Sequence, residues 1–121
     1  MDNDFKVNEK LYRAIYPPEI MDMFWKKDGT LSSAAFADPK GLSVDRGNFR
    51  PDTEVATDMS TRFIGNIVYL YAKNCYDAGA TIYYLPSKNN IYHSEIHGSP
   101  STPLLSKYQR RYLAQRAVLI N

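Results

Sequence analysis

The sequence contains a single cysteine, Cys75, so no disulfide can form within the chain, and its cysteine content gives no sign of an oxidising compartment. Long apolar runs are missing too: the stretch 67–72 is far shorter than the roughly 20 residues that cross a bilayer. The net charge is only +2, from 15 Lys and Arg against 13 Asp and Glu. Charge alone therefore does not indicate nucleic-acid binding, although it does not exclude it.

The first ten residues lack the basic start and the apolar segment of a secretory signal. We therefore expect a cytoplasmic protein that makes no contact with a membrane. Of the 121 residues, 44% are hydrophobic and 23% charged, a balance typical of one globular domain. We expect this domain over 11–121, preceded by a polar N-terminal segment over 1–10.

Periodicity predicts the elements of an α+β fold. Alternation of apolar and polar residues predicts strands over 11–16, 42–46 and 91–97, and β-branched and aromatic residues before Pro86 predict another over 81–85. Helical spacing of apolar residues predicts a short helix over 19–26, a main helix over 61–78, and an amphipathic helix that starts at Pro103 and includes Leu119. The charged stretch 48–57 is expected to be a surface connection. The predicted fold is a single small domain, with a short mixed or antiparallel sheet packed by a central and a C-terminal helix.

The main helix is predicted from apolar residues three and four positions apart. These are Ile64, Ile67, Val68, Tyr71 and Cys75. On this interpretation all of them except Ile67 are assigned to the core, with Cys75 an inert, packed thiol and not a nucleophile for His93.

Four segments carry a resemblance: LYRAIYPPEI, DGTLSSAAF, GLSVDR and YHSEIHG. With them, most of 11–98 resembles a set of short bacterial and phage proteins for which no activity is established. The resemblance implies a bacterial or phage origin and directs attention to a group of residues. They are Arg13, Ser32, Ser33, Phe36, Ser43, Arg46, His93 and Glu95.

A weaker similarity is to ADP-ribosyltransferases, some of which carry an Arg on the first strand, a Ser on a later strand and a catalytic Glu near the end. Arg13, Ser43 and Glu95 would take these roles, and the similarity would imply an NAD-using transferase. His93 stands where that family has a second Glu or Gln, two positions before the catalytic residue.

The pattern His93, Glu95, His97 places three chemically active side chains on one face of a predicted strand. Two imidazoles and a carboxylate can bind zinc or iron and activate water. Solvated or hydrogen-bonded side chains are the simpler interpretation, so we expect no metal and no cofactor. His93 and Glu95 remain the candidate catalytic pair.

Cationic residues form the other candidate group. Lys107, Arg110 and Arg111 share one side of the C-terminal helix, where phosphate binding is the alternative to a merely solvated surface. An Arg on an apolar strand face, such as Arg13 or Arg46, needs an anion or hydrogen-bond partners. The predicted ligand-binding residues are Arg13, Ser43, Arg46, Arg110 and Arg111.

The leading prediction is a small ligand-binding domain that holds a phosphorylated or nucleotide-like molecule through Arg and Tyr side chains. One alternative is a small hydrolase or transferase built around His93, Glu95 and Arg13. Another is an oligomeric interaction protein in conflict between phage and host. Because the chain has ten tyrosines, we also expect a homodimer formed through surface rings such as Tyr108 and Tyr112.

Overall fold

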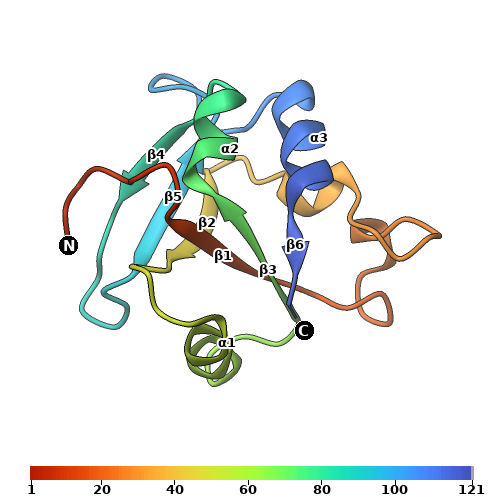
Figure 1. Ribbon diagram of the computed structural model, residues 1–121. Coiled ribbons are helices and arrows are strands. Elements are labelled where there is room, and N and C mark those ends of the chain that lie inside the picture. Colours follow the sequence, from red (N-terminus) through yellow and green to blue (C-terminus); the bar gives the residue numbers. More distant parts are fainter. Residues whose placement is uncertain (121) are drawn as a thin grey trace.

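The strands of this protein form one antiparallel sheet with helices on both faces, as the computed structural model shows for residues 1–120 (Figure 1). The strands are β1 (Lys10–Ile15), β2 (Leu42–Arg46), β3 (Asn66–Tyr71), β4 (Thr81–Tyr84), β5 (His93–His97) and β6 (Val118–Leu119). Their order in the sheet is β4-β5-β2-β1-β3-β6. The predicted α+β class is therefore confirmed. Asn121, the last residue of the expected domain, lies outside the described residues.

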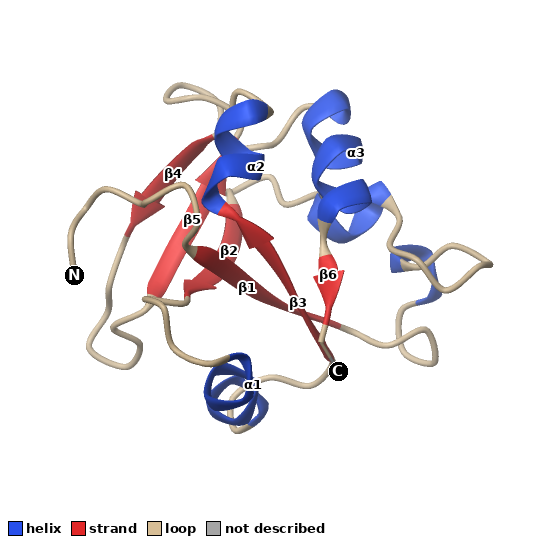
Figure 2. Ribbon diagram, in the orientation of Figure 1, coloured by secondary structure: helices blue, strands red, loops and turns tan. Residues whose placement is uncertain are grey.

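The helices cover one face of the sheet fully and the other face only in part (Figure 2). On one side lie α2 (Ala72–Asp77), α3 (Lys107–Arg116) and two 3-10 turns, η1 (Asp22–Phe24) and η2 (Ser33–Phe36). On the other side lies α1 (Asp52–Ser60). None of the helices formed by residues 1–120 has the length and apolar character needed to cross a membrane.

The larger core fills the space between the sheet and the helices of the fully covered face. Buried side chains of β1, β2, β3 and β5 meet η2, α2 and α3 there, among them Phe36, Cys75 and Leu113. A smaller core joins Val55 and Met59 of α1 to Tyr12 and Ile67. Because these two α1 residues are spaced i, i+4, they lie on the same side of the helix and pack it against the sheet.

The predicted main helix over 61–78 is wrong. Residues 66–71 form strand β3, and only 72–77 is helical. The run NIVYLY is rich in β-branched and aromatic residues, which pack well on a sheet, and in β3 both Ile67 and Val68 are buried on opposite faces. Val68 and Cys75 are buried as expected, but Ile64 lies outside both elements with 70% of its surface exposed, and Tyr71 is 37% exposed, so the assignment of these two to the core is wrong.

Other predicted elements differ in length or kind. The expected connection over 48–57 contains most of α1, and the expected helix over 19–26 shrinks to the single turn η1. The C-terminal helix is confirmed, but it ends at Arg116, so Leu119 lies in β6 instead. Strands predicted over 11–16, 42–46, 81–85 and 91–97 are confirmed with small shifts of their ends.

The N-terminal segment is part of the packed structure. Phe5 belongs to the larger core, and Glu9 is 2% exposed. The Glu9 carboxylate accepts hydrogen bonds of 2.8 Å from both Nε and Nη2 of Arg46 on β2. The Arg46 guanidinium also lies between the rings of Phe5 and Tyr84, at 4.1 and 4.7 Å from the ring centroids. This ion pair links the segment before β1 to β2.

Candidate functional site

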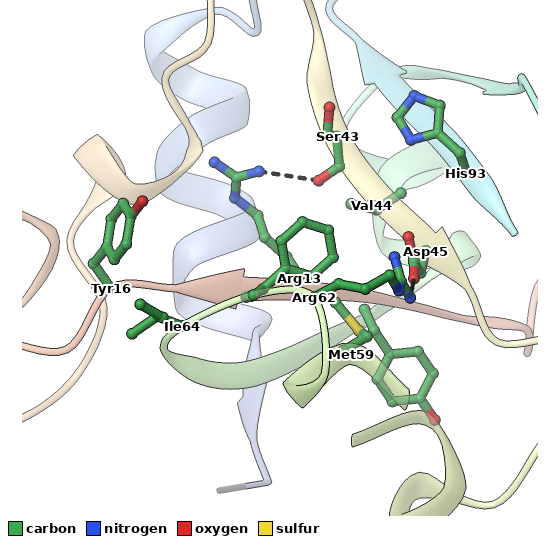
Figure 3. A pocket seen from close by; sticks show the side chains of 12 residues that line it. Arg13, Tyr16, Ser43, Val44, Asp45, Met59, Arg62, Ile64 and His93 are labelled. Atoms are coloured by element: carbon green, nitrogen blue, oxygen red, sulfur yellow. Dashed lines mark hydrogen bonds and ion pairs between the residues drawn. The ribbon is translucent and has the colours of Figure 1, made fainter. Parts of the chain in front are cut away.

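A cavity of about 480 Å³ opens on the face of the sheet that α1 partly covers. Its walls come from β1, β2, β5, the end of α1 and the segment that follows α1. The lining residues are Tyr12, Arg13, Ala14, Tyr16, Ser43, Val44, Asp45, Met59, Arg62, Phe63, Ile64 and His93. Figure 3 shows Tyr16 and Ile64 on one side of Arg13, and Ser43 and His93 on the other.

The cavity lies where two neighbouring strands part. β1 pairs with β3 over its whole length, but with β2 it pairs only at Leu11 with Arg46 and Tyr12 with Asp45. Beyond Tyr12 the Arg13 side chain joins the two strands, because its Nη1 donates to the carbonyl oxygen of Ser43 at 3.0 Å. An arginine therefore takes the place of the missing backbone ladder at the edge of the cavity.

The Arg13 guanidinium has two hydrogen-bond partners, and both are uncharged. Nε donates to the carbonyl of Ala35 at 3.2 Å, and Nη1 donates to Ser43. Burial lowers the pKa of Arg13, and the more distant carboxylate of Asp38 acts in the opposite direction. Arginine nevertheless stays protonated in proteins. The cavity wall therefore holds a permanent positive charge that no carboxylate of residues 1–120 neutralises by direct contact.

The Nη2 group of Arg13 has no hydrogen-bond partner within the described part of the chain. Every fully buried side-chain nitrogen or oxygen in that part does have one. It follows that Nη2 is in contact with solvent. Arg13 is also one of the residues that line the cavity.

The other arginines that pack against the sheet each have a carboxylate partner. Arg46 pairs with Glu9, and Arg62 pairs with Asp45 at 2.7 Å. The Asp45 carboxylate also accepts a 2.8 Å hydrogen bond from the side-chain amide of Asn90. The single carboxylate of the cavity lining is thus already engaged, and it does not neutralise Arg13.

Glu95 joins the two histidines of the protein on the same face of β5. Its Oε2 lies 3.3 Å from Nε2 of His93, and its Oε1 lies 2.8 Å from Nε2 of His97. A neutral imidazole that donates Nε2–H to a carboxylate has its lone pair on Nδ1. For a neutral imidazole beside an ionised Glu95, this arrangement favours the tautomer whose Nδ1 is free to accept a proton.

Gly41 explains how these side chains fit against the start of β2. With φ at +105°, it adopts a conformation that side chains disfavour, and a Cβ there would lie 2.5 Å from Nε2 of His97 and 3.0 Å from Oε1 of Glu95. Among residues 1–120, no group of three His, Cys, Asp or Glu side chains is placed to hold a metal ion.

The structure brings together some of the predicted site residues and separates the others. Arg13, Ser43 and His93 line one cavity, with Glu95 directly behind His93. Arg46 is buried in its pair with Glu9, outside the cavity lining. Arg110 and Arg111 lie on α3, which covers the opposite face of the sheet.

The aromatic side chains of the cavity were not identified from the sequence. Tyr16 and Phe63 line it and are 46% and 45% exposed, and Ile64 stands beside them. Tyr16 follows β1, and Phe63 follows α1, so their proximity depends on a fold contact between distant segments. In the sequence Arg62, Phe63 and Ile64 stand in succession directly before Gly65, and all three line the cavity.

Comparisons with protein-family models, curated proteins and solved structures find no match. The resemblance to short bacterial and phage proteins therefore stays a prediction. The chemistry of the site rests on the residues of this chain.

Proposed function

We propose that the cavity binds a small molecule in which a phosphate-type anionic group is attached to an aromatic or apolar part. The observation that carries this proposal is Arg13, a permanently charged, partly buried guanidinium without a carboxylate partner on the cavity wall. A charge withdrawn from water is costly unless it is paired. An anionic ligand would supply the missing partner.

The geometry of Arg13 favours the binding of an anionic ligand. Two carbonyl oxygens from η2 and β2 fix the guanidinium plane, so little side-chain entropy is lost when a ligand binds. The unpartnered Nη2 retains donor capacity toward an oxyanion. Charge-assisted hydrogen bonds of this kind are about twice as strong as neutral ones.

The remaining walls suit an aromatic or apolar group. Tyr16, Phe63 and Ile64 offer exposed apolar surface on one side of Arg13. Ring faces can stack on a flat ligand group such as a nucleobase. The volume of about 480 Å³ lies in the range of small-molecule sites, roughly 300 to 1,000 Å³. Nucleoside monophosphates and aryl phosphates are the ligand classes that combine both features.

Calorimetric titration with phenyl phosphate and adenosine monophosphate tests the proposal, with phenol and adenosine as uncharged counterparts. We expect the charged ligands to bind and the uncharged ones to bind at least about tenfold more weakly. Arg13→Gln should abolish the preference, and Arg13→Lys should retain part of it. Arg111→Gln, which removes a cation from α3, is the matched control and should bind like the wild type.

Far-ultraviolet circular dichroism establishes that each variant is folded. If Arg13→Gln does not fold, amide chemical-shift mapping on the wild-type protein decides instead. Shifts confined to the cavity lining would support the proposal. Equal affinity for phenol and phenyl phosphate, or shifts centred on α3, would refute it.

A second candidate function is a small hydrolase that transfers the phosphoryl group of a phosphomonoester to water and releases inorganic phosphate. It is favoured by one observation: His93, oriented through Nε2 by Glu95, lines the same cavity as Arg13. Release of inorganic phosphate during incubation with phenyl phosphate separates the two candidates. Turnover that His93→Gln removes would establish the enzyme, whereas binding without turnover of this substrate would leave the ligand-binding domain as the better description.

A further inference from the structure

His93 and His97 share one carboxylate but differ in their surroundings. Both Nε2 atoms face Glu95, yet His93 lines the cavity and His97 does not. The ring of His97 packs edge-on against Tyr83, with centroids 4.9 Å apart. The Nδ1 atom of His93 has no hydrogen-bond partner among residues 1–120. His93 is thus the histidine whose second nitrogen can respond to a ligand in the cavity.

The charged and titratable groups around His93 come from every strand packed near it. Glu95 lies on its own strand, and Asp45 is its cross-strand partner on β2. Arg62 reaches Asp45 from the segment after α1, and Arg13 lies across the cavity on β1. From β4, Tyr83 is the cross-strand partner of Glu95 and contributes an uncharged phenol.

These neighbours leave the protonation of His93 open to control by a ligand. Asp45 is engaged by Arg62 and Asn90, and the Glu95 carboxylate is shared between two imidazoles. Protonated His93 would therefore add a cation to a cavity wall where Arg13 already lacks a carboxylate. An anion bound between them would interact favourably with both charges.

We propose that His93 makes anion binding in the cavity dependent on protons, so that the site holds its ligand tightly at acidic pH and releases it as the pH rises. This inference rests on the proposed function, because it assumes that the cavity binds an anion. The sign follows from linkage: a ligand that prefers a protonated imidazole binds best below the pH range in which histidines titrate, and its affinity falls as the pH rises through that range.

The choice of probe separates protonation of the protein from protonation of the ligand. A phosphomonoester loses its second proton near pH 6, in the same range as histidine. Phenyl sulfate carries one fixed negative charge across this range. Any change in its affinity with pH therefore reports a group of the protein.

Phenyl sulfate is titrated into the wild-type protein from about pH 5.5 to about pH 8.5, which spans the histidine range. We expect the affinity to fall about tenfold across this interval, equivalent to a one-unit shift in one protonation equilibrium. His93→Gln should bind with a constant, weak affinity. His97→Gln is the matched control, because it removes the other imidazole from the same carboxylate, and it should keep the pH dependence.

The outcomes are distinguishable. Binding that needs Arg13 but has the same strength at both ends of the pH range would overturn the role of His93 and leave the proposed function intact. That role would also be overturned if the pH dependence persists in His93→Gln or disappears in His97→Gln instead. If neither phenyl sulfate nor phenyl phosphate binds at any pH, the proposed function fails as well.

Discussion

Removal of Glu9 should strip the buried Arg46 of its counter-ion. The Glu9 carboxylate accepts two bonds from the guanidinium and one of 3.0 Å from the backbone amide of Asn48. The side chains of Glu9 and Arg46 are only 2% and 3% exposed, so water cannot replace the lost partner. The carbonyls of Asp2 and Asp4 would remain as acceptors for the Arg46 guanidinium, but they carry no full charge.

Breaking a buried ion pair on one side destabilises a protein by about 3 to 5 kcal/mol. We expect Glu9→Ala to lose stability in that range, a large share of the roughly 5 to 15 kcal/mol that holds a small domain together. In urea unfolding followed by circular dichroism, the midpoint should fall by about 2 M, for a slope of roughly 2 kcal/mol per molar. Asp77→Ala removes the exposed pair with Lys73, whose side chains are 42% and 63% exposed. That control should change stability by less than about 1 kcal/mol.

The pair of changes Glu9→Leu with Arg46→Met should recover much of the loss, because it removes both charges and keeps the apolar stems. A loss for Glu9→Ala no larger than that for Asp77→Ala would refute the reasoning. It would mean that the N-terminal segment is not docked on β2.

Two further predictions concern the sheet. Val68→Asp should unfold the protein, because it places an unpaired carboxylate at a site that is 1% exposed. Ile64→Asp, at a site that is 70% exposed, should change the melting temperature little. Equal effects of the two variants would contradict the assignment of 66–71 to a strand. The pKa of Asp52 is held below its ordinary value of 3.8, chiefly by the 2.5 Å hydrogen bond from the Tyr12 hydroxyl, with burial opposing and Lys10 assisting. The contribution of Asp52 to the stability of the fold is therefore complete above that value, and it is lost as the pH falls through the lower folded pKa. Asp52→Asn should consequently weaken the dependence of stability on pH on the acid side. An unchanged dependence would refute the assignment.

Much of the sheet could be predicted because its strands either alternate in polarity or are rich in β-branched and aromatic residues. Leu42–Arg46 and Thr81–Tyr84 carry β-branched or aromatic residues between turn signals, and both are strands. The prediction of a helix over the run from Ile64 to Cys75 was wrong because a strand buried on both faces shows no alternation of apolar and polar residues. The start of α2 also continued the helical spacing of apolar residues. Length and β-branched content were the better guides there.

The candidate site was predictable in its residue types but not in its pairings. Arg13 and Arg46 both look like arginines on apolar strands. What separates them is Glu9, which lies 37 residues before Arg46 and becomes its partner only in the folded chain. Arg13 finds carbonyls instead of a carboxylate, and this depends on where η2 packs. Sequence spacing contains neither fact.

The short ladder between β1 and β2 divides the sheet into two halves, and we call the boundary between these two strands the seam. On one side lie β4, β5 and β2, and on the other β1, β3 and β6. Two residue pairs cross the seam, with the Arg46–Glu9 pair close to one end and Arg13 bridging to Ser43 at the other. The cavity opens at the second end, and its walls belong to both halves. A ligand held by Arg13 from one half and His93 from the other would therefore connect the two halves of the sheet at the point where backbone pairing between β1 and β2 stops.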